Sequence, residues 1–254
     1  MARRPIRTAL RFLEFLRFSV TSVQDHRRSV LPRETSGPDL RARAEWTHRH
    51  AKRLCRILRC TVETVGNPAQ AALYGSNHLG YLDIVTLGAA TPVIFVSKAE
   101  VRRWPILGTL ASCGGTLFLK RERKEDLKQV TQQFDPVVST GIPLAIFLEG
   151  TSSGGDGVLP FRPSLLAPAV DAGWSVAPVS VDYEVSSGRV ADDIAYWRDD
   201  TFLPHFWTLL SQDWIRARIS FGAAQPAGTD RKLLAKDLQE KVIALRNQGR
   251  TRPK

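Results

Sequence analysis

The chain has 254 residues, 43% of them hydrophobic and 8% aromatic, which is typical of a globular protein with a substantial core. Its three cysteines, Cys55, Cys60 and Cys113, form no CxxC pair, and the N-terminus shows no secretory signal pattern. We therefore expect a reducing, cytosolic-side environment rather than a disulfide-stapled secreted fold. The net charge of +11 is concentrated in residues 1–59, which hold 15 Lys and Arg against 5 Asp and Glu.

Residues 4–18 have the periodicity of an amphipathic helix. One face carries Arg4, Arg7, Arg11 and Glu14, and the other carries Ile6, Ala9, Phe12, Leu13 and Leu16. Two interpretations stay open: a helix lying in a membrane interface with its arginines in water, or a helix packed on its own domain with an arginine-rich exposed face. Both predict that the arginines face solvent, and the first predicts binding to an anionic bilayer surface.

A second helix is predicted after a short link. Residues 32–39, PRETSGPD, contain two prolines and a glycine, which is typical of a connecting loop. A stripe of apolar or small residues then repeats at helical spacing, through Leu40, Ala44, Thr47, Ala51, Leu54, Cys55 and Leu58. The sequence therefore predicts a basic N-terminal helical hairpin over residues 1–60, to which we assign membrane-surface association.

From residue 61 the pattern changes to short β-rich runs separated by longer mixed segments. Seven strands are predicted, at residues 61–65, 71–75, 93–97, 116–119, 144–148, 176–181 and 218–221. The spacing leaves room for helices between them, which predicts an α/β domain at 61–248 with a largely parallel, mixed sheet flanked by helices. A capped closing helix is expected after Thr229 and Asp230, with a basic tail at 249–254.

Two other features limit the function classes. The longest apolar run, residues 84–96, is interrupted and shorter than the roughly 18 residues that span a bilayer, so no transmembrane helix is expected. A nucleic-acid partner is not expected, because the basic segment lacks interleaved aromatic residues and a recognisable docking module. A non-catalytic protein that binds an anionic surface or a nucleic acid stays a distant alternative.

Candidate chemistry begins at the end of the predicted strand 71–75, in the segment SNHLGYLD at residues 76–83. On an unbroken helix, His78 and Asp83 would lie about 140° apart, but a turn at His78 brings them within reach of each other. His78 would then accept a proton from a substrate hydroxyl while Asp83 fixes the imidazole tautomer. The alternative is an ordinary turn in which both residues cap and pack.

A second candidate segment, Glu149-Gly150-Thr151-Ser152, follows a predicted buried strand. It joins a carboxylate to a loop rich in backbone and hydroxyl donors, which suits an anionic or polyhydroxyl ligand. No Gly-Lys-Ser/Thr follows the glycines, so the segment is not a Walker loop. A flexible surface turn is the alternative interpretation.

A third segment places two cations, Lys120 and Arg121, after the predicted strand 116–119. The arginine can bind a phosphate through two parallel hydrogen bonds, and the lysine adds a point charge. Two solvated surface cations are the alternative. These residues are therefore candidates for binding an acidic head group.

In this order and at these separations, the segments resemble the phospholipid/glycerol acyltransferase family, which includes the 1-acyl-glycerol-3-phosphate acyltransferases. The resemblance spans residues 40–225. It is carried by four blocks: Asn77-His78 with Asp83; Lys98, Glu100, Trp104-Pro105 and Gly108 with Gly115 and Phe118 to Arg121; Phe147 to Thr151; and Ala177-Pro178-Val179.

This resemblance implies that His78 is the general base for the acceptor hydroxyl and that Asp83 orients it. It implies direct transfer of a fatty acyl group from acyl-CoA or acyl-carrier protein to a lysolipid, with no metal, no cofactor and no acyl-enzyme. Pro178 is implied on the acyl side of the site. Acceptor contacts are implied for Asn77, Lys120, Arg121, Glu149, Gly150, Thr151 and Ser152.

The chain departs from the family pattern in ways that concern the acceptor. Leu148 and Ser152 stand where the pattern has proline and arginine, so one fixed phosphate-binding cation is missing. The stretch from Glu149 to Arg162 is similar to a bacterial branch that includes lyso-ornithine lipid acyltransferases, and Arg162 is a candidate for the missing charge. His205, further along, is expected to be structural. The acceptor is therefore either lysophosphatidate or, as the alternative, lyso-ornithine lipid.

A serine or cysteine hydrolase that uses Ser152 or Cys113 is the rival enzyme class. The sequence lacks the Gly-x-Ser-x-Gly elbow of such enzymes, and that class does not account for the ordered blocks. We therefore expect an O-acyltransferase, bound peripherally at the cytoplasmic face of the membrane.

Overall fold

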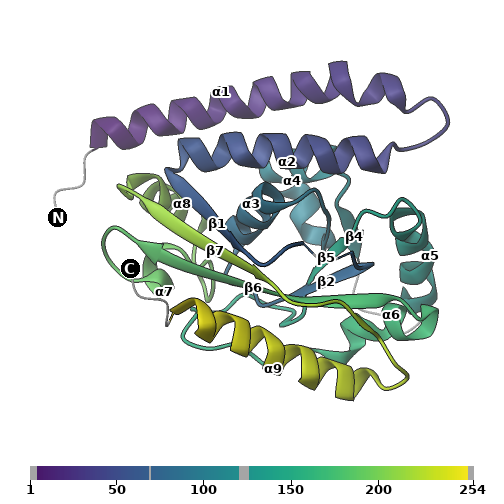
Figure 1. The fold of residues 1–254 in the computed structure, drawn as a ribbon. Helices are drawn as coiled ribbons and strands as arrows, with labels where there is room; N and C mark the ends of the chain where they lie inside the picture. Colours follow the sequence, from purple (N-terminus) through teal and green to yellow (C-terminus); the bar gives the residue numbers. More distant parts are fainter. Residues whose placement is uncertain (1–4, 69, 120–125, 251–254) are drawn as a thin grey trace.

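One sheet of eight strands lies at the centre of the part of the chain that the structure describes (Figure 1). This computed structural model describes residues 5–68, 70–119 and 126–250. All seven predicted strands are present; β6 and β7 are longer than predicted, and the short β8 was missed. The strands are β1 Cys60–Val65, β2 Leu73–Ser76, β3 Ile94–Lys98, β4 Leu117–Leu119, β5 Leu144–Phe147, β6 Ser175–Val185, β7 Ile215–Phe221 and β8 Gln225–Pro226.

The sheet is mixed and largely parallel, which confirms the predicted fold class. Its strand order is β1-β7-β6-β2-β5-β3-β4, and β8 pairs with β6. Strand β2 lies between β5 and β6 and is parallel to both, whereas β7 is antiparallel to β6. The carboxyl ends of β2 and β5 therefore meet at the same edge, where α/β sheets usually bind their ligands. His78 and Glu149 follow these two ends.

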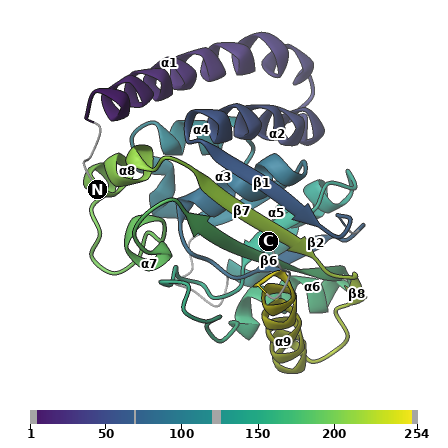
Figure 2. The ribbon, with the colours of Figure 1, turned by 60° about the vertical axis from the view of Figure 1, so that its left-hand side comes forward.

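Helices cover both faces of the sheet (Figures 1 and 2). One core cluster joins the hairpin and α8 to the sheet through residues such as Phe15, Leu54 and Val179, and a second joins α9 to the opposite face through residues such as Leu238 and Val176. The helices are α1 Pro5–Ser29, α2 Leu40–Ile57, α3 Tyr81–Ala90, α4 Leu107–Cys113, α5 Asp126–Val138, α6 Ala167–Ala172, α7 Val190–Asp193, α8 Phe202–Ser211 and α9 Arg231–Arg250; short 3-10 turns span Leu31–Arg33, Ala99–Arg103 and Pro163–Leu166.

The predicted helical hairpin is present and lies along one side of the domain, with α1 running antiparallel above α2 (Figure 1). The Asp39 carboxylate caps α2 by accepting a hydrogen bond from the Ala42 amide at 2.9 Å. The two helices are tied by His50, whose Nδ1 is 2.9 Å from the Ser22 hydroxyl and whose Nε2 is 2.9 Å from the Asp25 carboxylate. The hairpin is thus a packed part of the domain.

The prediction that the arginine face of α1 meets water is wrong at Arg11, while Arg7 is half-buried and Arg4 lies outside the described residues. Arg11 is 5% exposed, and its Nη1 donates to the carbonyls of Leu210 at 2.6 Å and Gln212 at 2.5 Å. Arg7 pairs with Asp213 on the same side. The reason lies in α8, whose last carbonyls have no partner within their own helix and carry its partial negative charge. The solvent-facing residues of α1 are instead apolar at several positions: Ile6, Leu10, Leu13 and Val20.

Replacing Arg11 with Met should lower the free energy of unfolding by about 2 kcal/mol, because two charge-assisted hydrogen bonds to buried carbonyls are lost. Urea unfolding followed by circular dichroism measures this loss. The matched control is Arg17→Met, an exposed arginine of the same helix, which should change stability by less than about 0.5 kcal/mol. Equal effects of the two substitutions would show that Arg11 does not fasten α1 to α8.

The C-terminal helix continues slightly further than predicted. The basic tail was expected from residue 249, but α9 runs to Arg250, and residues 251–254 lie outside the described part of the chain. Within the described residues, no helix is both long and apolar enough to cross a bilayer.

Candidate active site

The turn between β2 and α3 carries the His–Asp pair. Asp83 lies in the first turn of α3, and its Oδ2 accepts hydrogen bonds from the backbone amides of Leu79 at 2.6 Å and Gly80 at 3.0 Å. Acidic residues are favoured at this position because the first amides of a helix have no partner within the helix. Asp83 is fully buried, and the Tyr183 hydroxyl donates to its Oδ1 at 2.7 Å. Its carboxylate is therefore fixed from both sides.

His78 is held against this carboxylate as the sequence predicts. Its Nδ1 is 2.7 Å from Asp83 Oδ2, and its ring stacks on Phe147 with the centroids 4.1 Å apart and the planes at 14°. A carboxylate that already accepts two amide hydrogens is an acceptor, so Nδ1 carries the imidazole hydrogen and Nε2 has its lone pair available. The side chain of His78 is 21% exposed, which leaves it accessible to a substrate. This is the geometry of an oriented general base.

Asn77 lies in the same turn but points into the sheet. It is 1% exposed; its side-chain amide donates to the Val181 carbonyl at 2.9 Å, and its Oδ1 accepts from the Val181 amide at 2.9 Å. This reciprocal pair extends the β2–β6 ladder by one step. Both of its polar side-chain atoms therefore position the turn, and its predicted contact with substrate stays a prediction.

The loop after β5 closes on the other side of His78. The Ser153 amide donates to the His78 carbonyl at 2.9 Å, which joins the two predicted segments. Gly150 has φ +71°, and a Cβ there would lie 2.6 Å from Arg162 Cδ, so glycine allows Arg162 to cross the loop. Arg162 Nε donates to the Glu149 carbonyl at 3.1 Å. The sequence reasoning did not foresee the role of Ser153.

Glu149 and Arg162 line a cleft of about 530 Å³. Thr151 lines the same cleft, whereas Ser152 is half-buried beside it. Glu149 is 2% exposed: its Oε1 accepts from the Leu159 amide at 3.1 Å, and its Oε2 is buried with no hydrogen-bond partner among the described residues. Burial, reinforced by the nearby Asp83 charge and opposed by the Leu159 amide, raises the pKa of Glu149 to about 7.

This raised pKa predicts how Glu149→Gln changes stability with pH. The folded state binds this proton more tightly than the unfolded chain, in which the carboxyl has its ordinary pKa of 4.5. The stability that the proton contributes is therefore fully present below pH 4.5 and is lost as the pH rises through 7. The glutamine variant has no such loss. Relative to wild type, it should gain on the order of 2 kcal/mol of unfolding free energy between pH 5 and pH 8 in urea titrations. If the unfolding free energies of the two proteins differed by the same amount at pH 5 and pH 8, the raised pKa of Glu149 would be contradicted.

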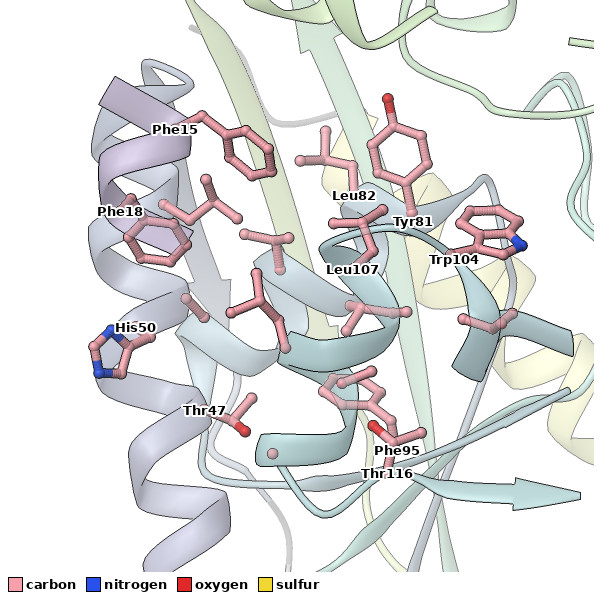
Figure 3. A pocket seen from close by; sticks show the side chains of 18 of the residues that line it. Phe15, Phe18, Thr47, His50, Tyr81, Leu82, Phe95, Trp104, Leu107 and Thr116 are labelled. Carbon is pink, nitrogen blue, oxygen red and sulfur yellow. The ribbon is translucent and has the colours of Figure 1, made fainter. Parts of the chain in front are cut away.

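An apolar pocket of about 130 Å³ lies on the hairpin side of the sheet (Figure 3). Tyr81 and Leu82, which precede Asp83 in the first turn of α3, form part of its wall. Figure 3 shows Phe15 and Phe18 of α1 entering from the opposite side, with Trp104 beyond Tyr81 at the far end. The pocket thus extends from the helical turn that carries Asp83 to the hairpin.

Pro178, predicted on the acyl side of the site, is not among the residues that line this pocket. Successive residues of a strand point to opposite faces of the sheet. Ala177 and Val179 pack in the cluster on the hairpin side, whereas Pro178 faces α9: a Cβ built on Gly222 would lie 2.7 Å from Pro178 Cγ and 3.3 Å from Leu245 Cδ1. Pro178 therefore supports the sheet from the far face.

The remaining predicted residues and some unpredicted ones complete the site. Lys120 and Arg121 lie outside the described residues. His205 is structural in its contacts, since its Nδ1 is 2.7 Å from the Tyr81 hydroxyl and its Nε2 is 3.0 Å from the Ala195 carbonyl. Arg246, which sequence reasoning missed, pairs with Asp182 at 3.1 Å and donates to the Gly155 carbonyl, so α9 braces the loop after β5. Among the described residues, no cluster of three His, Cys, Asp or Glu side chains is arranged to hold a metal ion.

A buried carboxylate and a partly exposed histidine at the carboxyl ends of parallel strands, next to an apolar pocket, define an α/β enzyme domain built for base catalysis beside an apolar group. The chain belongs to the acyltransferase family. The Acyltransferase family model matches residues 58–182, and the enzyme is therefore an O-acyltransferase.

Several relatives support this membership. The chain is 36% identical to the lyso-ornithine lipid O-acyltransferase of Pseudomonas aeruginosa, over 75% of this chain and 74% of that protein. It is 30% identical to the 1-acyl-sn-glycerol-3-phosphate acyltransferase of Neisseria meningitidis, over 71% of this chain and 73% of that protein. The crystal structure of the 1-acyl-sn-glycerophosphate acyltransferase of Thermotoga maritima covers 96% of this chain, and 99% of that chain is covered, with a TM-score of 0.62 and 19% identity. That crystal structure shares the fold.

Proposed function

We propose that the protein transfers a fatty acyl group from acyl-CoA or acyl-carrier protein to the free hydroxyl of a lysolipid, converting 1-acyl-sn-glycerol-3-phosphate to phosphatidic acid. The observation that carries the proposal is the His78–Asp83 pair, 2.7 Å apart, with Nε2 of the imidazole free to accept a proton. The relatives are divided between the lysophosphatidate and lyso-ornithine lipid acceptors, which makes a lysolipid the substrate class that they share.

The reaction needs no protein nucleophile, because the acceptor supplies one. His78 Nε2 takes the proton of the acceptor hydroxyl as its oxygen attacks the thioester carbonyl, and Asp83 stabilises the imidazolium that forms. The new C–O ester bond forms, the C–S bond breaks, and the imidazolium returns its proton to the leaving thiolate. A thioester is already activated, so positioning and base catalysis suffice without a metal or an organic cofactor.

The cleft lined by Glu149, Thr151 and Arg162 is our proposed acceptor head-group site. Glu149 and Arg162 line it together, which places a carboxylate and a guanidinium in one cleft. Lys120 and Arg121 are further proposed contacts for a phosphate. The alternative acceptor, lyso-ornithine lipid, is favoured by one feature: a carboxylate beside an arginine complements a head group that carries both an ammonium and a carboxylate.

The apolar pocket is our proposed site for a fatty acyl chain. Its lining is almost wholly apolar, and it begins in the helical turn that holds Asp83 (Figure 3). An acyl chain placed there would leave its reacting end near His78, because Tyr81 and Leu82 line the pocket and lie three and four residues after the histidine. Burial of the chain contributes about 0.8 kcal/mol for each methylene.

We also propose that the hairpin side of the molecule binds the cytoplasmic face of the membrane, where a lysolipid resides. The exposed residues Ile6, Leu10, Leu13 and Val20 follow one stripe of α1, and Leu203 and Trp207 continue it on α8. Phe12 of α1 and Trp207 are in contact, with ring centroids 6.2 Å apart, so the two helices share this surface. Exposed Arg17, Arg27 and Arg28 on α1 add attraction to anionic lipids.

Substituting Leu10 and Leu13 with Ser should weaken binding to vesicles of mixed neutral and anionic phospholipid by about 10-fold or more, since two exposed apolar side chains no longer enter the interface. Vesicle co-sedimentation measures the partition. Leu233→Ser, an exposed leucine on α9 at the opposite side of the sheet, is the matched control and should leave binding unchanged. Equal loss in the two proteins would refute this membrane face.

The acceptor is tested by thiol release from an acyl-CoA with purified protein, run with lysophosphatidate, with lyso-ornithine lipid and with neither. Release that depends on lysophosphatidate supports the proposed reaction, and release only with lyso-ornithine lipid supports the alternative. Equal release with and without an acceptor would indicate a hydrolase and contradict the proposal.

A further inference from the structure

The segment that follows α7 lies against both loops that hold His78. The Tyr196 amide donates to the Leu79 carbonyl at 2.8 Å, one residue after the histidine. A Cβ on Gly80 would lie 2.8 Å from the Tyr196 nitrogen, so glycine permits this close approach. On the other loop, a Cβ on Gly154 would lie 2.5 Å from the indole of Trp197. Residues 196 and 197 are thus packed at two points around the candidate base.

The next residue, Arg198, is held in place by Trp197. The guanidinium carbon of Arg198 is 3.8 Å from the centroid of the Trp197 ring, a stacked cation–π contact. The indole nitrogen of Trp197 donates to the Ala191 carbonyl at 2.8 Å, which anchors the ring to α7. The cation is therefore preorganised rather than free to rotate in solvent.

Arg198 is also strained. Its φ of +56° lies in the left-handed region, which costs a non-glycine residue roughly 1 kcal/mol or more and is often retained where the residue has a task. The turn that contains it is closed by a hydrogen bond from the Trp197 amide to an Asp200 carboxylate oxygen at 3.4 Å. By contrast, Arg189, which precedes α7, pairs with Asp192 at 3.6 Å.

Few other cations are available at this rim. Ser152 supplies no charge, and Arg246 is neutralised by Asp182 beneath the loop. Arg162 donates through its Nε to the Glu149 carbonyl and lines the proposed head-group cleft. Of the described arginines next to these loops, Arg198 combines exposure to solvent with a fixed guanidinium plane.

We propose that Arg198, stacked on Trp197, binds the anionic group of the acceptor lipid and so positions the acceptor hydroxyl at His78. The inference rests on the proposed lysolipid acyl transfer and adds a positioning residue to it. A guanidinium binds either a phosphate or a carboxylate through two parallel hydrogen bonds, which covers both candidate acceptors. The contacts of Tyr196 at Gly80 and of Trp197 at Gly154 hold the segment that carries this cation against the two loops around His78.

The test is Arg198→Ala in the full-length protein, with initial rates measured over ranges of acyl-CoA and of whichever acceptor supports turnover. The KM for the acceptor should rise at least 10-fold, while the KM for acyl-CoA and the urea midpoint stay at their wild-type values. Arg198→Lys should recover part of the loss, because a point charge replaces the planar fork. Arg189→Ala, at the arginine that precedes α7, is the matched control and should leave both KM values unchanged.

An unchanged acceptor KM in an active Arg198→Ala protein would overturn this inference and leave the proposed function intact. So would equal rises in both KM values, which would indicate a general disturbance of the site. Absence of acceptor-dependent turnover in the wild-type protein, with acyl-CoA and with acyl-carrier protein alike, would remove the proposed function and this inference with it.

Discussion

Replacing His78 with Ala should lower kcat/KM for acyl transfer by about 10³-fold while the protein stays folded. The imidazole is the base, and the hydroxyl of a lysolipid is too weak a nucleophile without one. Because His78 is partly exposed and its contacts are with Asp83 and the face of Phe147, the loss of its ring removes little of the core. Initial rates of thiol release, with urea unfolding in parallel, measure both parts of this result.

The matched control is Phe147→Leu, which removes the stacking partner of the imidazole and keeps the His78–Asp83 hydrogen bond. It should cost activity less than about 10-fold, because the base itself is retained. Full activity of a folded His78→Ala protein would exclude His78 as the base. Equal losses in the two variants would indicate that packing around the ring, rather than its basic nitrogen, limits the rate.

Replacing Asp83 with Asn should reduce kcat by about 10³-fold and leave the KM for the acceptor within a few fold. The amide oxygen should take the place of Oδ2, where the Leu79 and Gly80 amides donate, so that Nδ1 keeps its hydrogen and the NH₂ group faces Tyr183. The loss of activity then comes from the imidazolium, which loses its counter-charge. Nuclear magnetic resonance of the ring nitrogens of His78 in both proteins reports the tautomer directly.

Tyr183→Phe is the matched control, because it changes the surroundings of the Asp83 carboxylate without removing its charge. It removes the hydrogen bond to Asp83 Oδ1 and keeps the bond between Oδ2 and His78. We expect a loss of less than about 10-fold in kcat and about 1 kcal/mol in stability. If Asp83→Asn were as active as Tyr183→Phe, Asp83 would be only a helix cap.

The local parts of this site could be predicted from the sequence. The turn at residues 77–80 and the acidic residue in the first helical turn are encoded within eight residues, and the structure places His78 and Asp83 2.7 Å apart. The end of the strand before Glu149 was predicted for the same reason, because a short apolar run followed by Gly and Ser is a local signal. The acceptor roles of Thr151 and Ser152 stay predictions.

The parts that depend on pairing between distant segments could not be predicted. Tyr183 reaches Asp83 from 100 residues away, and Asn77 meets Val181 only because β2 and β6 pair in one register. A shift of one residue would turn every side chain to the other face, so the sequence alone does not show on which face of the sheet Pro178 lies. Nothing in the sequence near Trp197 shows that its ring packs on Gly154.

The orientation of α1 was misjudged for a related reason. Its periodicity shows two faces but not which one meets the domain. The carbonyls that end α8, contacted by Arg11, decide this, and they belong to residues about 200 positions further along the chain. An arginine face usually meets water, so the expected arrangement followed the commoner case.

Mass spectrometry of the lipid products, with isotope-labelled acyl-CoA and a lysolipid acceptor, tests the account most directly when wild type and folded His78→Ala are compared. The account predicts labelled acceptor ester formed in equal amount to the released thiol by wild type, and at least about 10³-fold less by the variant. Labelled free fatty acid in place of the ester, or ester formed at the wild-type rate by His78→Ala, would contradict it.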